Sequence, residues 1–271
     1  MTAIDTWGEA EIPTILYKYK PFDKEGYTMK ILTDGEIYFP SICKLNDPFE
    51  GDIPYIFDNN ELTSDNIFLA MRKIAKENNL EMTEEELHKY LFEEQKQNLL
   101  FDINHLEDQR QKTKEIVDSL FGIYSLTNNN NNFLMWSYYA NSHKGICIGF
   151  DSEKLFKITE GTIGAVTYSE NLPQMHLSDV NKPNSFYERL ISTKSTDWSH
   201  ENEFRLTKIG LANKIITVPL NTIKEIIFGC KTEFDQKRDI VEFIKANNKD
   251  CKIFEASMSK SKFKLDINRI F

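Results

Sequence analysis

The chain has 271 residues, enough for one large domain or two small ones with a sizeable core. Hydrophobic residues make up 40% and charged residues 28%, and the formal net charge of −9 argues against binding to nucleic acid through bulk electrostatics. No stretch approaches the roughly 18 apolar residues of a membrane-spanning helix, and the N-terminus lacks a signal-peptide pattern. We therefore expect a cytoplasmic protein with no membrane partner.

The cysteines and histidines indicate neither a disulfide framework nor a zinc site. The four cysteines are far apart and form no Cys-x-x-Cys pair, which favours a reducing compartment. Cys147 lies in an apolar run and is expected to be a buried small hydrophobe. The histidines lack zinc-ligand spacing, so we predict no structural metal.

The first part of the chain alternates between strand and helix patterns. Residues 15–19 and 36–39 have the composition of strands, and residues 27–32 have that of a short helix between them. Residues 46–52 are rich in turn-forming types, and Asp47 precedes a proline, which disfavours helix at that position. We expect Asp47 or Asn46 to hold this turn by accepting hydrogen bonds from local amides, rather than to bind a metal.

Residues 61–120 form an acidic block with helical periodicity. Thr83 and Glu86 have the spacing of a capping box, which marks the start of a helix. The apolar stripes in this block are better explained as core than as partner sites. We predict a helical insertion at residues 61–120 that covers one side of a sheet.

Beyond residue 120 short strand patterns dominate. Strands are predicted at residues 122–127, 146–150, 163–168, 204–209, 215–218, 226–228, 253–256 and 263–267. Helices are predicted at residues 133–143, closed by Gly145, and at residues 233–246. The asparagine run Asn128–Asn132 is expected to be a mobile loop, and the basic segment 260–269 to protect an edge strand. No repeat or clear linker interrupts the chain, so we predict a single α+β domain over residues 1–271 with a mixed, split or strongly twisted β-sheet.

The segment that leads into the strand at residues 204–209 carries three charged groups. Along a strand Glu201, Glu203 and Arg205 would share one face, while Phe204 would point into a core. Two carboxylates and a guanidinium in register are costly to cover with apolar packing, so they need water or a ligand. An ordinary solvated sheet face has the same pattern.

Other candidate site residues lie on the preceding elements. On the predicted helix 133–143, Trp136, Tyr139 and His143 are about one turn apart and could stack on a nucleobase or nicotinamide ring, although a buried aromatic stripe has the same spacing. Ser125 and Thr127 share one face of their strand, where they could admit a planar ligand or simply bond across strands.

Lys18 and Lys20 project opposite to Tyr17 and Tyr19 on the first strand. Either lysine could meet a phosphate group or remain solvated.

Four motifs in chain order resemble the widespread bacterial domain-of-unknown-function family 2971. They are residues 45–50, residues 125–127 leading into 134–140, residues 143–151, and Lys194 and Trp198 followed by residues 201–205. Tyr138 stands where the family pattern usually has a histidine, so this chain has no imidazole at that position. The motifs span most of the chain, but the family supplies no established reaction.

A more distant resemblance is to ADP-ribosyltransferases, which have a split β-sheet with a helical insertion and three signatures in chain order. The matching residues are Lys18, then Ser125–Thr127, then Glu201–Glu203. This sequence departs from the ADP-ribosyltransferase pattern in two of the signatures: the first strand has lysine where arginine or histidine is usual, and Ser-Leu-Thr is a loose match to the second. It has no glycine-rich loop that could bind phosphate instead. The resemblance implies NAD as the substrate.

The resemblance also implies roles for individual residues. Glu203 would stabilise the positive charge that develops on the ribose, Glu201 would orient the acceptor nucleophile, and Ser125 would complete the catalytic group. The implied NAD-binding residues are Lys18, Thr127, Trp136, Tyr139, His143 and Arg205. Of these, Lys18 or Arg205 would neutralise the pyrophosphate.

We therefore expect an NAD-dependent ADP-ribosyltransferase-like protein of a bacterial phage-defence system or toxin–antitoxin pair, acting on a macromolecular target or with a cognate protein partner. The second hypothesis is a non-enzymatic sensor or partner-binding module. The third is a metal-dependent phosphodiesterase that uses acids of the 46–52 turn (Asp47, Glu50 and Asp52), together with Glu203 and Lys194. Acids in such a turn more often bond to the local backbone.

Overall fold

The computed structural model describes residues 6–7, 10–52, 54–55, 57–77, 82–177, 179 and 183–271. Its internal contacts divide the chain into two compact units. Unit 1 comprises Met1–Ser41, Leu120–Tyr168 and Thr196–Phe271, and unit 2 comprises Ile42–Ser119 and Ser169–Ser195.

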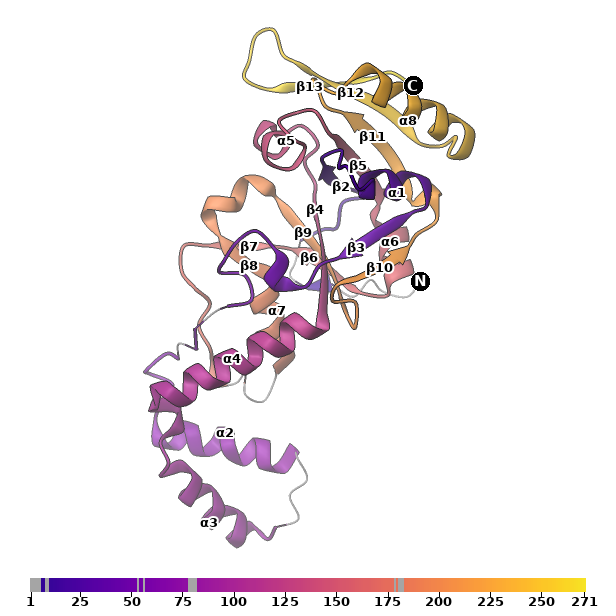
Figure 1. Ribbon diagram of the computed structural model, residues 1–271. Coiled ribbons are helices and arrows are strands. Elements are labelled where there is room, and N and C mark those ends of the chain that lie inside the picture. Colours follow the sequence, from indigo (N-terminus) through magenta and orange to yellow (C-terminus); the bar gives the residue numbers. More distant parts are fainter. Residues whose placement is uncertain are drawn as a thin grey trace. The chain divides into compact units, whose positions relative to one another are not determined.

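Unit 1 is built on an open, mostly antiparallel sheet, in which nine strands are described, in the order β1-β6-β9-β4-β2-β5-β11-β12-β13 (Figure 1). The strands are β1 (Thr6–Trp7), β2 (Ile15–Lys20), β4 (Phe121–Thr127), β5 (Ile146–Asp151), β6 (Thr162–Ala165), β9 (Glu203–Ile209), β11 (Ile223–Phe228), β12 (Lys252–Met258) and β13 (Leu265–Arg269). Only the described pairs β1–β6 and β11–β12 are parallel. The predicted mixed α+β class is confirmed.

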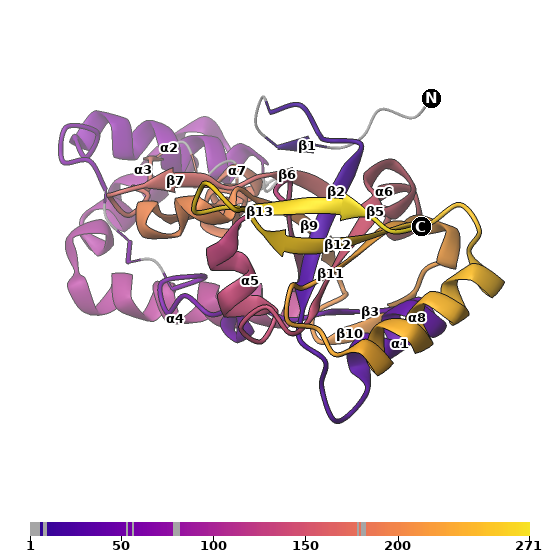
Figure 2. The same ribbon diagram turned by 90° about the horizontal axis from the view of Figure 1, so that it is seen from above.

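Helices and a second small sheet complete unit 1. They are α1 (Tyr27–Thr33), α5 (Phe133–Tyr139), α6 (Ser152–Thr159) and α8 (Phe234–Asn247), the 3-10 helices η4 (Thr196–Glu201) and η5 (Leu220–Thr222), and the antiparallel pair β3 (Glu36–Phe39) and β10 (Lys214–Thr217). Helices α1 and α8 lie side by side in both views (Figure 2). Strand β7 (Thr167–Ser169) follows β6.

Unit 2 is mainly helical and contains the predicted insertion. Its elements are η1 (Ile42–Lys44), α2 (Ser64–Glu77), α3 (Glu84–Gln95), η2 (Leu99–Phe101), α4 (Ile103–Leu120), α7 (Pro183–Ser192) and β8 (Thr193–Ser195). The capping box is confirmed: the Thr83 hydroxyl accepts from the Glu86 amide, and the Glu86 carboxylate accepts from the Thr83 amide. Leu87 and Leu91 of α3 pack with Ala75 of α2, so the apolar stripes serve as core.

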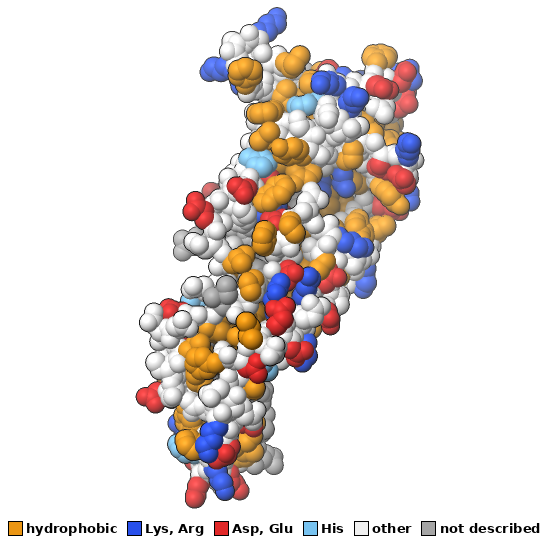
Figure 3. Space-filling view, turned by 60° about the vertical axis from the view of Figure 1, so that its left-hand side comes forward, with side chains coloured by type: hydrophobic (Ala, Val, Ile, Leu, Met, Phe, Trp, Pro, Cys, Tyr) orange, Lys and Arg blue, Asp and Glu red, His pale blue; other side chains and the backbone are white. Residues whose placement is uncertain are grey.

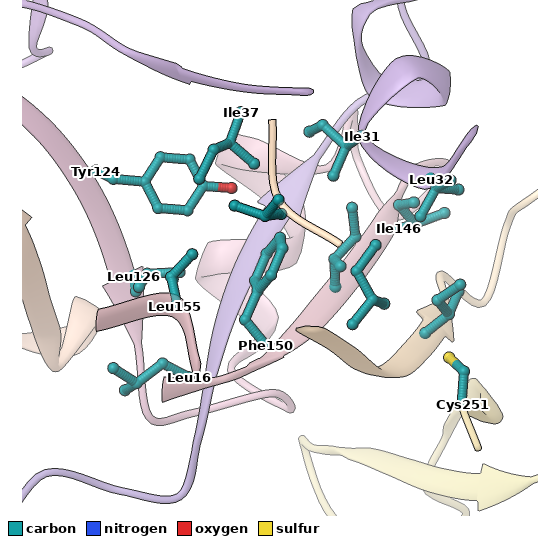
Figure 4. Close-up of a cluster of buried hydrophobic side chains, with 14 of the residues drawn as sticks. Leu16, Ile31, Leu32, Ile37, Tyr124, Leu126, Ile146, Phe150, Leu155 and Cys251 are labelled. Carbon is teal, nitrogen blue, oxygen red and sulfur yellow. The ribbon is translucent and has the colours of Figure 1, made fainter. Parts of the chain in front are cut away.

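Hydrophobic clusters cover both faces of the main sheet. One contains Leu16, Tyr124 and Phe150 (Figure 4), and the other contains Tyr17 and Trp136. Because neighbouring residues of β2 alternate, one strand contributes to both clusters. Burying such a side chain contributes about 1.5–3 kcal/mol, so the sheet is held from both sides.

Cys147 lies in the second cluster and is fully buried, as predicted. Burial raises the pKa of its thiol well above the usual value. A thiol that stays protonated is a poor nucleophile, so Cys147 serves as packing.

The predicted helix 133–143 is shorter in the structure. Helix α5 ends at Tyr139, and Asn141, Ser142 and His143 have φ values of 46°, 53° and 71°. Residues in this left-handed region cannot continue a right-handed helix. Gly145 is therefore not the residue that ends the helix. It is needed because a Cβ there would lie 2.2 Å from the carbonyl oxygen of Lys20.

The basic segment 260–269 forms the turn of the β12–β13 hairpin and strand β13, which is an edge strand of the sheet as predicted. Met258 and Phe263 are exposed on this hairpin, and its tip at the top of Figure 3 shows basic beside hydrophobic side chains. Within the described ranges, no helix combines the length and apolar character needed to cross a bilayer.

Candidate functional site

Polar and charged side chains converge where β4 pairs with β9. Ser125 lies opposite Arg205, and Thr127 lies opposite Glu203. Opposed residues of an antiparallel pair project from the same face, so these four side chains share one face of the sheet. Phe204 packs in the hydrophobic cluster of the other face, which confirms the predicted alternation along β9.

Glu203 and Arg205 form a bidentate ion pair on this face. The Arg205 Nε donates to Glu203 Oε1 at 2.9 Å, and Nη2 donates to Oε2 at 3.1 Å. Arg205 is 0% exposed and Glu203 is 4% exposed. Glu203 and Arg205 thus do not depend on water or a ligand, contrary to the prediction, because each gives the other a charge-assisted partner.

Glu201 does not lie on the strand, contrary to the prediction. It ends η4, and Asn202, with φ of 43°, separates it from β9. Its carboxylate accepts a hydrogen bond from the Tyr139 hydroxyl, and its backbone carbonyl accepts one from Thr127 Oγ1 at 2.6 Å. Glu201 is buried. The turn at Asn202 thus brings a second carboxylate beside α5 and β4 rather than along the β9 face.

Two side chains that the sequence analysis did not single out fix this junction. Tyr168 accepts a hydrogen bond at its hydroxyl from the Glu203 amide at 2.8 Å. Asn132 caps the N-terminus of α5 by accepting from the amides of the first turn, and its Nδ2 donates to the His200 carbonyl at 2.7 Å. An asparagine immediately before a helix is a capping signal that could have identified it.

The asparagine run expected to be mobile is anchored at several points. The Tyr19 hydroxyl donates to the Asn129 carbonyl at 2.9 Å, and Trp136 Nε1 donates to the Asn130 carbonyl at 3.1 Å. Trp136 is fully buried, with the Tyr19 ring edge-on at 5.1 Å between centroids. The Trp136 side chain therefore has the packing of a core residue, which matches the alternative interpretation of the aromatic stripe.

His143 lies beyond the end of α5 and does not continue a helical face with Tyr139. Its Nε2 is 3.1 Å from Ser137 Oγ, and its buried Nδ1 has no hydrogen-bond partner among the described residues. Burial, followed by the nearby charge of Lys231, lowers the pKa of His143. This environment favours the neutral form of the imidazole.

Lys18 lies on the opposite face of the sheet from Glu203. Its Nζ donates to the Ser125 carbonyl at 2.6 Å and lies 5.0 Å from the centroid of the Tyr124 ring, and Tyr124 belongs to the first hydrophobic cluster. Lys18, which the resemblance places in the same NAD site as Ser125 and Glu203, therefore does not share their face of the sheet. Arg205 is the basic residue that shares the Glu203 face.

The acids of the 46–52 turn in unit 2 have separate partners. Asp47 Oδ1 accepts from the Phe49 amide at 2.9 Å, as predicted for a residue that holds the turn. Glu50 and Lys194 form a buried ion pair at 3.3 Å. In the part of the chain that the structure describes, no group of three His, Cys, Asp or Glu side chains could hold a metal ion.

Asp52 bonds to two cations of α4, Arg110 and Lys114, each at 2.7 Å. Burial alone would raise the pKa of Asp52, but the hydrogen bonds from Lys114 and Arg110 outweigh it and hold this pKa below its usual range. Asp52 thus ties the turn to α4.

Comparison with known families agrees with the resemblance to the unknown-function family. A family model described as "Protein of unknown function (DUF2971)" matches residues 135–206. This segment runs from α5 to the start of β9 and includes Tyr139, Glu201, Glu203 and Arg205. Searches of the curated proteins and of the solved structures gave no match. The comparisons therefore assign no activity.

Proposed function

We propose that unit 1 carries an NAD-cleaving site of the ADP-ribosyltransferase type, with Glu201 as its catalytic carboxylate. The observation that supports this proposal is the position of Glu201, whose carboxylate is held by the Tyr139 hydroxyl and whose backbone is held by Thr127. Thr127 shares its face of the sheet with Ser125 and Glu203. Hydroxyl groups and carboxylates are the groups that such a reaction needs near the ribose.

In the proposed reaction, the bond between the ribose C1′ and the nicotinamide nitrogen breaks, and nicotinamide leaves with the bonding electrons. A nucleophile of the target macromolecule, or water, then bonds to C1′ and loses a proton. Positive charge develops on the ribose during bond cleavage, and a fixed carboxylate stabilises it more than it stabilises bound NAD. Glu201 supplies that charge, and Tyr139 fixes its orientation.

We assign this role to Glu201 rather than to Glu203, which the sequence had favoured, because the Tyr139 hydroxyl orients the Glu201 carboxylate. The bidentate contact with Arg205 balances the charge of Glu203. A carboxylate whose charge a guanidinium balances in this way stabilises a second cation less effectively. In the proposal, Glu203 and Arg205 hold the first residues of β9 in place, and Ser125 and Thr127 offer hydroxyl groups beside them.

The test is nicotinamide release from NAD, measured by chromatography on purified protein with and without cell extract as a source of acceptor. We expect Glu201→Gln to lower the rate by about a hundredfold or more, because it keeps the hydrogen bond from Tyr139 but removes the charge. Glu242→Gln, at an exposed position of α8, is the matched control and should leave the rate unchanged. Melting temperatures of both variants check that the fold is retained.

A second candidate function is a non-enzymatic sensor or partner-binding module. The mutual pairing of Glu203 and Arg205 and the complete burial of Trp136 favour it, because these features stabilise the fold without any ligand. If the wild-type protein neither binds nor consumes NAD under either condition, the enzyme proposal fails and this function takes its place. The setting in bacterial defence or a toxin–antitoxin pair stays a prediction under both functions.

A further inference from the structure

A separate cavity of about 420 Å³ lies in unit 1. Helix α1 lines it with Tyr27 and Ile31, β3 with Tyr38, and β10 with Ile215. These elements neighbour one another in Figures 1 and 2. Two aromatic rings and two branched aliphatic side chains suit a flat apolar body. The cavity is large enough for a one- or two-ring molecule.

Tyr124 also lines this cavity. Tyr124 is 2% exposed, yet its hydroxyl has no hydrogen-bond partner among the described residues. Figure 4 shows the oxygen directed toward Ile37 and Ile31, and Ile31 belongs to the cavity wall. Buried hydroxyl groups nearly always have a partner, so a cavity that ends on such a group is suited to a polar ligand atom.

Lys20 is the basic residue of the cavity wall. It projects from the same face of β2 as Lys18, whose ammonium is occupied by the Ser125 carbonyl and the Tyr124 ring. The ammonium of Lys20, by contrast, has no ion-pair partner among the residues the structure describes. Burial lowers the pKa of Lys20, and the charge of Asp23 opposes this effect only in part. An anionic ligand would stabilise the charged form of this half-buried ammonium.

The other charged side chain in the cavity wall, that of Glu36, limits the negative charge that a ligand can carry. Glu36 lines the cavity, and its carboxylate lies 3.7 Å from the ammonium of Lys30. One ammonium group and one phenol, with a carboxylate nearby, suit a single negative charge better than a phosphate dianion, which needs several donors.

We propose that this cavity binds a small aromatic carboxylate, with the ring between Tyr27, Tyr38 and Ile215 and the carboxylate on the Lys20 ammonium. The Tyr124 hydroxyl donates a second hydrogen bond to the ligand carboxylate. The site is on the opposite face of the sheet from Glu203, and it does not depend on the proposed NAD reaction.

The test compares two probes of nearly equal size, 2-naphthoate and its neutral counterpart 2-naphthylmethanol, by isothermal titration calorimetry on the full chain. We expect wild-type protein to bind naphthoate at least tenfold more tightly than the alcohol. Lys20→Met should remove this preference, and Tyr124→Phe should weaken naphthoate binding severalfold. Lys24→Met changes an exposed lysine of the same region and should alter neither affinity.

Three results would overturn the proposal. They are equal affinity of wild-type protein for both probes, an unchanged naphthoate preference in Lys20→Met, and displacement of naphthoate by NAD. The two probes compared on unaltered protein test the proposal even if a variant fails to fold. Failure of NAD cleavage would leave these results untouched, so the two proposals can fail separately.

Discussion

Removal of either partner of the Glu203–Arg205 pair alone should strongly lower the stability of unit 1. Both side chains are almost completely excluded from solvent, and two parallel hydrogen bonds join them at 2.9 and 3.1 Å. Breaking a buried pair costs about 3–5 kcal/mol, because the remaining charge stays buried without its partner. At about 2–4 °C per kcal/mol for a domain of this size, Arg205→Met should lower the melting temperature by roughly 6–20 °C.

The two single variants should differ in their response to pH. In Arg205→Met, the carboxyl of Glu203 loses its guanidinium, so burial raises its folded-state pKa above the unfolded value of about 4.3. The folded state then gains protons as the pH falls, and the stability loss should shrink between pH 7 and pH 5. In Glu203→Gln, the arginine cannot lose its proton, so the loss should stay constant over the same range.

Urea unfolding followed by tryptophan fluorescence is the suitable assay, because Trp7, Trp136 and Trp198 all lie in unit 1. The double variant Glu203→Leu/Arg205→Met replaces the pair by apolar groups and should recover most of the lost stability. The coupling energy from this double-mutant cycle should therefore be several kcal/mol. Two results would refute this prediction. One is a free energy of unfolding of the single variants within about 0.5 kcal/mol of wild type, and the other is a stability loss in the double variant equal to the sum of the two single losses.

Two further predictions concern His143 and Asp47. Burial and the Lys231 charge lower the folded-state pKa of His143 below 6.5. The contribution of His143 to the free energy of unfolding should therefore be complete above pH 6.5, and it should be lost as the pH falls toward the folded-state pKa. Urea unfolding of wild type should show this slope and His143→Asn should not, since asparagine tolerates the positive φ there; equal slopes would exclude His143 as its source. Asp47→Ala removes the hydrogen bond to the Phe49 amide and should cost about 1 kcal/mol by circular dichroism. Micromolar binding of Mg²⁺ or Mn²⁺ that disappears in this variant would instead favour the phosphodiesterase hypothesis.

The regular elements were predictable because their signals are local. The strand pattern at residues 36–39 matches β3, and the Thr83 capping box marks the start of α3. Periodicity and caps depend on residues within one or two turns, so a single sequence contains the information. Helix α6 was missed although Asp151 caps it, because its eight residues follow β5 without a break and give too short a periodic run.

The candidate site was less predictable because its geometry depends on distant parts of the chain. Alternation along β2 correctly separated Lys18 from Tyr17, but the face that Glu203 occupies follows from the pairing of β9 with β4 and of β4 with β2. Periodicity within one strand carries no information on that register. Asn202 has a positive φ, so Glu201 does not belong to the strand that begins at Glu203. The alternating pattern of charges gave no sign of this break.

The alternation of β2 has a consequence for any dinucleotide bound near Glu201. Lys18 and Lys20 lie on the face opposite to Glu203, and Arg205 is engaged in its pair with Glu203. A pyrophosphate beside Glu201 would therefore compete with Glu203 for the guanidinium, and binding would expose a buried carboxylate. NAD binding should thus weaken the Glu203–Arg205 coupling, and the coupling energy measured with saturating NAD should fall below its value without NAD. An unchanged coupling energy with NAD bound would mean that the pyrophosphate is held by other groups, such as backbone amides, and that Arg205 has only a structural role.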